Sequence, residues 1–160
     1  MNDRIISVIK KDYFAYSYEK AKEMIEEAFR LLDLDTNHCN TAEWNPLSEI
    51  ISPGMNVLIK PNLVMDHNHN LDNGTKCLYT QVEVVEPVLQ YVIKALNGKG
   101  KIVIGDAPMQ ECDFDMLIKQ SGYKDLVDRY SNSGIDIELV DFRDLKSVVR
   151  GGSTNIPVKG

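Results

Sequence analysis

Two short polar segments carry the side chains of this sequence that are best placed to do chemistry. Lys60 and Asn62 follow the apolar run 57–59, and Asp106 follows the apolar run 102–104. A lysine can hold a carboxylate or phosphate as a compact charge, and an asparagine offers a donor and an acceptor to the same ligand. An aspartate can orient a hydroxyl group, ligate a metal or act as a base. The residue types predict Lys60 and Asn62 as ligand contacts and Asp106 as a candidate catalytic residue.

The two segments meet only if their apolar runs are neighbouring parallel strands. In an open parallel sheet every strand delivers its carboxyl end to one edge, and ligands lie in the crevice there. The same arrangement has a second interpretation, in which Lys60 and Asp106 pair with each other and cap the core without binding a ligand.

Thr80 is a further candidate ligand-binding residue. The segment 80–83, Thr-Gln-Val-Glu, predicts a capping box at the start of a helix. This helix follows the strand at 55–59, so its free N–H groups would face the same edge and could bind an anion. Ordinary capping by Thr80 and Glu83 explains the pattern as well. No Gly-rich phosphate loop follows a predicted strand, so the standard nucleotide cradle is not expected.

The loop after residue 65 contains side chains that a transition metal accepts. His67 and His69 lie there, with Asp66 before them and Cys77 later in the loop. No Cys-x-x-Cys or His-x-x-x-His pattern accompanies them, so the spacing favours a solvated loop. We therefore predict no metal site from the sequence and keep His67 and His69 as weak candidates.

Strands and helices that could position these residues alternate along the chain. The apolar run at 55–59 has no polar alternation, which predicts a central strand covered on both faces, whereas alternation at 135–140 predicts a strand nearer the sheet edge. The remaining expected elements are a strand over 4–10, a helix capped by Ser17, a long connection over 33–54 with one helical turn, a helix from Thr80 to a left-handed stop at 97–100, a strand over 101–106 and two short helices between 114 and 134.

This order predicts an α/β fold with a mostly parallel, open sheet of about four strands and flanking helices, joined by right-handed crossovers. Residues 1–150 are interpreted as a single domain. Residues 151–160 have no expected partner element within the chain, so we interpret them as a terminal arm or as the start of a missing segment of a larger domain.

Composition narrows the class of protein. The chain has 160 residues, of which 43% are hydrophobic and 26% charged, as in globular domains. Its net charge of −6 argues against the broad positive field used in nucleic-acid binding. No stretch approaches the ~18 apolar residues of a membrane span, and the three cysteines are far apart and odd in number. We therefore expect a cytoplasmic protein that binds neither nucleic acid nor membranes.

The same strand ends resemble a known family. The segments 57–64 and 102–108, the helix from Thr80 and the Ser-Gly-Tyr break at 121–123 together resemble the domain of unknown function 362 family. The resemblance implies an α/β domain, and because some relatives carry fused ferredoxin-type clusters, it points to redox or small-molecule work. This chain has no clustered cysteines, so the iron–sulfur cluster is not carried over and the cofactor is unknown.

Three functional hypotheses follow. The first is a small-molecule domain, with or without catalysis, that binds an anionic ligand at the strand carboxyl ends. The second is an assembly module that forms a homo-oligomer or joins a partner chain by strand addition. The third is a redox component acting with a separate iron–sulfur protein, which depends on the family resemblance alone.

Overall fold

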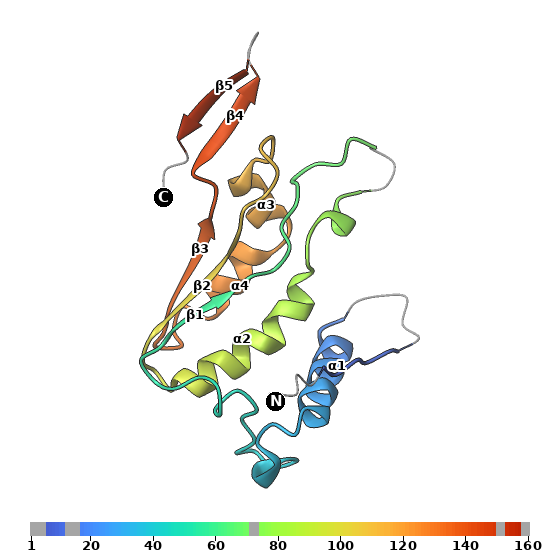
Figure 1. Cartoon of the computed structure of the whole chain (residues 1–160), viewed down its shortest axis with the longest axis vertical. Coiled ribbons are helices and arrows are strands. Elements are labelled where there is room, and N and C mark those ends of the chain that lie inside the picture. Colours follow the sequence, from blue (N-terminus) through green and yellow to red (C-terminus); the bar gives the residue numbers. More distant parts are fainter. Residues whose placement is uncertain (1–5, 12–16, 71–73, 150–152, 158–160) are drawn as a thin grey trace, which may run out of the picture.

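The computed structural model describes residues 6–11, 17–70, 74–149 and 153–157 (Figure 1). Helices and strands alternate through most of this length. In chain order they are α1 (Tyr18–Leu31), η1 (Thr36–His38), β1 (Asn56–Ile59), η3 (Lys76–Leu78), α2 (Val82–Leu96), β2 (Lys101–Asp106), α3 (Phe114–Gln120), α4 (Tyr123–Arg129), β3 (Asp136–Asp141), β4 (Leu145–Val149) and β5 (Ser153–Pro157).

The central feature is a parallel sheet with the strand order β1-β2-β3. Ile59 pairs with Ile104, and Asp106 pairs with Asp141, so all three strands end at one edge. This arrangement confirms the predicted α/β fold with an open parallel sheet. The described sheet has three strands, where about four were expected.

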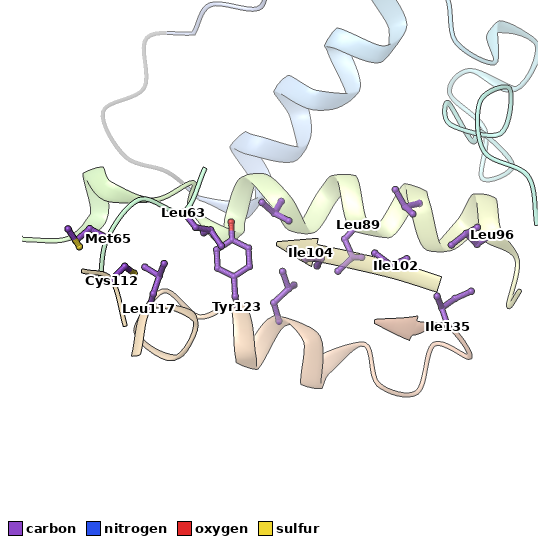
Figure 2. Packing of buried hydrophobic residues seen from close by; sticks show 13 residues of the cluster. Leu63, Met65, Leu89, Leu96, Ile102, Ile104, Cys112, Leu117, Tyr123 and Ile135 are labelled. Carbon is purple, nitrogen blue, oxygen red and sulfur yellow. The ribbon is translucent and has the colours of Figure 1, made fainter. Parts of the chain in front are cut away.

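The helices that connect these strands cover one face of the sheet (Figure 1). Both α2 and α4 lie there, and Arg129 of α4 pairs with Glu86 of α2 at 2.8 Å. Figure 2 shows the apolar core that these helices enclose with β2. Its buried members are Leu63, Met65, Val85, Leu89, Val92, Leu96, Ile102, Ile104, Cys112, Leu117, Tyr123, Leu126 and Ile135.

The other face of the sheet is not covered by a helix of the described residues (Figure 1). Leu58 of β1 is 56% exposed on this face, and its partner Val103 on β2 is partly exposed. The expectation that the 55–59 strand is central and covered on both faces is therefore wrong. Its apolar run does not alternate, but β2 occupies the centre and β1 the edge.

The strand expected over residues 4–10 is also wrong for the part that is described. Residues 6–10 have no regular secondary structure, and residues 4 and 5 lie outside the described residues. Ile6 and Val8 are 82% and 81% exposed. Branched apolar residues favour a strand only when a neighbouring strand and a core receive them, and here neither does.

The helix expected after Ser17 is confirmed as α1. The Ser17 hydroxyl accepts a hydrogen bond from the N–H of Lys20 at 3.4 Å, which caps the first turn. Helix α1 packs on α2 rather than on the sheet, through an edge-on contact of Phe29 with Tyr91. The long connection that follows contains the expected helical turn, η1.

The helix α2 ends as predicted, because Asn97 adopts a left-handed conformation with φ 47° directly after Leu96. The helix starts at Val82, and Pro87 lies inside it.

Residues after β3 form an antiparallel hairpin of β4 and β5, in which Val149 pairs with Ser153 (Figure 1). Residues 153–157 therefore have a partner element within the chain, contrary to expectation. The Gly-Gly pair at 151–152, which follows the β-branched Val148 and Val149, is a hairpin signal in the sequence that was missed. Among the described residues, none of the helices has the length and apolar character needed to cross a bilayer.

Candidate functional site

The parallel sheet brings Lys60 and Asp106 together at its carboxyl edge. Lys60 Nζ lies 2.8 Å from Asp106 Oδ1. The second carboxylate oxygen, Oδ2, accepts a hydrogen bond from the backbone N–H of Leu63 at 2.8 Å. Asp106 is 8% exposed, whereas the Lys60 side chain is 54% exposed. The expected side-by-side arrangement is present, and Asp106 also holds the turn after β1.

The environment of Asp106 favours its ionised form. Burial by itself would raise the pKa of the carboxyl group, but the N–H of Leu63 and the ammonium of Lys60 outweigh it, and the pKa lies below its ordinary value. A carboxylate with a lowered pKa and both oxygens engaged is a poor general base near neutral pH. Asp106 is better suited to orienting Lys60 and the turn.

Thr80 and Asn62 are joined by two hydrogen bonds across the same edge. The Thr80 hydroxyl accepts from the N–H of Asn62 at 3.0 Å, and the N–H of Thr80 donates to the Asn62 carbonyl at 2.8 Å. Tyr123, fully buried, donates its hydroxyl to the Thr80 carbonyl at 2.8 Å, and Figure 2 shows its ring beside Leu63.

The predicted capping box at Thr80 is therefore wrong. The residue before the helix is Gln81, which makes no side-chain cap, and its amide instead donates to the carbonyl of Tyr79 at 3.2 Å. The Thr80 hydroxyl does not cap α2; it accepts instead from the N–H of Asn62, where the 62–64 segment meets the 78–80 segment. Pairing between two segments that lie far apart in the sequence has formed here in place of the local capping motif.

A hollow of about 200 Å³ lies beside these residues, between β1 and α2. Lys60, Asn62 and Thr80 line its polar part. The Asn62 side-chain amide makes no hydrogen bond within the described part of the chain, so its donor and acceptor are available to a ligand. The remaining lining residues are Ile59, Pro61, Val84, Val85 and Val88. Asp106 does not line the hollow; it contacts Lys60 from the side of β2.

His67 and His69 lie elsewhere on this edge, in the loop after β1. The centroids of their two rings are 5.0 Å apart, and the ring planes are nearly perpendicular. His69 Nε2 is 3.6 Å from Glu111 Oε2, and His67 Nδ1 is 3.2 Å from Asp66 Oδ1. Sequence reasoning missed Glu111, although its place in the loop after β2 put it on the same edge as the histidine loop.

Arg143 is a second residue that sequence reasoning missed. It is 7% exposed and its Nε donates to Asp141 Oδ1 at 2.9 Å. Its Nη1 donates to the carbonyls of Met109 and Cys112 at 2.7 and 3.1 Å. Arg143 therefore fastens the loop that carries Glu111 to the end of β3.

Comparison with known proteins places the chain in a family without supplying a characterised relative. No curated protein and no solved structure matches the chain significantly. A family model described as "Domain of unknown function (DUF362)" matches residues 57–157. The match covers more than half of the chain, from β1 through the β4–β5 hairpin, and includes Lys60, Asn62, Thr80 and Asp106. The chain belongs to this DUF362 family.

Proposed function

We propose that this domain binds a small anionic molecule at the carboxyl end of β1, in the hollow between β1 and α2. The observation that carries the proposal is the convergence of Lys60, Asn62 and Thr80 on one apolar-floored hollow. Small-molecule sites usually combine an apolar lining with a few polar groups that set the orientation of the ligand.

Lys60 and Asn62 would make the polar contacts. The Lys60 ammonium has three hydrogens, and its side chain is half exposed, so donors remain beyond the bond to Asp106. The negative charge of Asp106 offsets part of the positive charge of Lys60. Recognition would therefore depend on directed hydrogen bonds from Lys60 and Asn62 and on apolar contact with the floor, more than on net charge.

Asp106 would act through Lys60. Its oxygens are taken by Lys60 and the N–H of Leu63. It would gain an acid–base role only if a ligand displaced one of these partners. The proposed activity is therefore ligand binding, and a catalytic role for Asp106 is an extension of it.

A ligand panel followed by thermal unfolding tests this proposal. Small carboxylates and inorganic phosphate would be tested on the wild-type chain, because a ligand at about 100 times its dissociation constant adds about 2.7 kcal/mol of stability. Lys60→Met keeps the aliphatic stem and removes the charge, and it should abolish the shift. Lys119→Ala, at an exposed lysine of α3, is the matched control and should keep it. No shift from any anion, or an equal loss in the control, would refute the proposal.

The uncovered face of the sheet favours a second candidate function, assembly with another copy of the chain. Parallel sheets are almost always covered on both faces. Leu58 and Phe142 are 56% and 38% exposed on the face without a helix, and Met55 before β1 is 45% exposed. A second copy placed on this face would bury these apolar side chains.

Sedimentation at two concentrations tests the assembly candidate. The wild-type chain should shift toward dimer at the higher concentration, and Leu58→Lys should keep it monomeric while leaving the anion-induced thermal shift intact. A wild-type chain that stays monomeric at both concentrations contradicts assembly through this face.

A further inference from the structure

We propose that His67, His69 and Glu111 form a binding site for a divalent transition metal ion of the zinc class. One ligand atom from each residue lies within 4.8 Å of the other two. Two imidazoles and one carboxylate are a ligand set that zinc and cobalt accept. This inference is independent of the anion hollow, which uses none of the three residues.

The separations are close to what a bound ion requires. Zinc–nitrogen and zinc–oxygen bonds of about 2.0–2.1 Å in tetrahedral geometry place neighbouring ligand atoms about 3.3–3.4 Å apart. The Nε2 atom of His69 and the Oε2 atom of Glu111 are already 3.6 Å apart. All three residues are exposed, so small side-chain rotations can close the remaining gap without disturbing the core.

His67 has a partner that would prepare it for metal binding. Its Nδ1 atom lies 3.2 Å from the Asp66 carboxylate, which can only accept, so in the neutral imidazole this contact favours the tautomer with the proton on Nδ1 and the lone pair on Nε2. Metal-binding histidines commonly donate their second ring nitrogen to a carboxylate in this way. Asp66 is itself oriented, because its Oδ1 accepts from the N–H of Asp113 at 2.9 Å.

The two loops that supply the ligands are both tied down. The Asn68 side chain donates to the Gly74 carbonyl at 2.7 Å and accepts from the N–H of Asn70 at 3.0 Å, so the two residues that flank His69 are hydrogen-bonded to each other. The loop of Glu111 is fastened on both sides of this residue by the bonds from Arg143 to Met109 and Cys112. Holding the loops in place lowers the entropy lost when a metal binds.

Three protein ligands leave a fourth position for water or for a ligand atom. This number is typical of zinc sites that take part in chemistry or ligand binding, whereas structural zinc sites are usually closed by four protein ligands. The alternative is that His69 and Glu111 form a solvated ion pair and hold no metal.

Titration of the 160-residue chain, purified without a histidine tag, tests the site. Co²⁺ would be followed by its visible d–d absorption and Zn²⁺ by calorimetry. We expect one ion per chain, and we expect His67→Ala, His69→Ala and Glu111→Gln each to weaken binding at least about tenfold. Asp66→Asn should weaken it by about 10–100-fold, the usual effect of losing such a carboxylate.

Two control variants separate this site from other metal ligands. His38→Ala removes the one histidine outside the cluster, which pairs with Asp35 at 2.6 Å, and it should bind like the wild type. Cys77→Ser removes the exposed thiol of the same loop and should also bind like the wild type. Unchanged thermal unfolding of the metal-free variants would show that their folds are intact.

The proposal is overturned if the wild-type chain binds well under one ion, or if either control loses binding as strongly as Glu111→Gln. Lys60→Met distinguishes it from the proposed function, because that variant should lose the anion-induced shift and keep Co²⁺ binding.

Discussion

Replacing Asp106 and Lys60 separately should give very different losses of stability, although the two side chains form one ion pair. Asp106 accepts a hydrogen bond from the N–H of Leu63, a residue with 0% exposure. In Asp106→Ala that N–H is left buried without a partner, which costs about 1–3 kcal/mol, and the lost bond was one to a charged group. We therefore expect the free energy of unfolding to fall by about 2–3 kcal/mol.

Lys60→Met should cost far less. The Lys60 side chain is 54% exposed, and ion pairs exposed to solvent contribute about 0–1 kcal/mol. With about 2–4 °C per kcal/mol for a chain of this size, Asp106→Ala should lower the melting temperature by about 4–12 °C and Lys60→Met by less than about 4 °C. Asp106→Asn, which keeps an acceptor for Leu63, should lie between the two.

Urea and thermal unfolding at neutral pH, followed by circular dichroism, measure these losses. An equal loss in Lys60→Met and Asp106→Ala would refute the reasoning. It would mean that the ion pair itself stabilises the fold, and Lys60 would then be a structural residue rather than a ligand contact.

Three further predictions concern the same region. The pKa of Asp106 is lowered in the folded state, so the stability it contributes is present above the unfolded pKa of about 3.9 and is lost as the pH falls through the folded pKa. The free energy of unfolding should therefore fall less steeply with decreasing pH in Asp106→Asn than in the wild type. Identical acid-unfolding profiles would contradict this. Gly105→Ala should lower the free energy of unfolding by about 1–3 kcal/mol or more, because the added Cβ would lie 2.2 Å from the Val140 carbonyl oxygen. Urea unfolding measures this loss, and an unchanged urea midpoint would contradict the packing of β2 on β3. Burial and a neighbouring carboxylate raise the pKa of the Cys112 thiol to about 11. A thiol reagent at mildly alkaline pH should therefore modify the exposed Cys77 and react with Cys112 only when the chain unfolds. Equal modification rates of the two cysteines, followed by mass spectrometry, would contradict this.

Features that depend on neighbouring residues could be predicted from the sequence. The capped start of α1 at Ser17 and the left-handed end of α2 at Asn97 are set by residues within a turn of each other. Apolar runs also located β1 and β2. Because parallel strands end at one edge, these positions predicted that Lys60 and Asp106 would lie side by side if the two strands were neighbours, and β1 does pair with β2.

Relations between distant segments had to come from the tertiary structure. The Thr80 hydroxyl bonds to Asn62, 18 residues away, instead of capping its own helix. An apolar run such as that of β1 does not indicate whether helices cover both faces of the strand. Its place at the sheet edge and the exposure of Leu58 therefore could not be predicted from the sequence.

The sequence by itself determined the helices, the parallel strands and the edge at which their polar ends gather, because periodicity and apolar runs are local properties. Only the tertiary structure decided which polar groups pair at that edge. Lys60 pairs with Asp106, which the sequence had left open as one of two interpretations, while His69 lies beside Glu111, which comes from another loop. Such pairings depend on strand order and loop anchoring, and these are fixed by contacts between residues far apart in the chain.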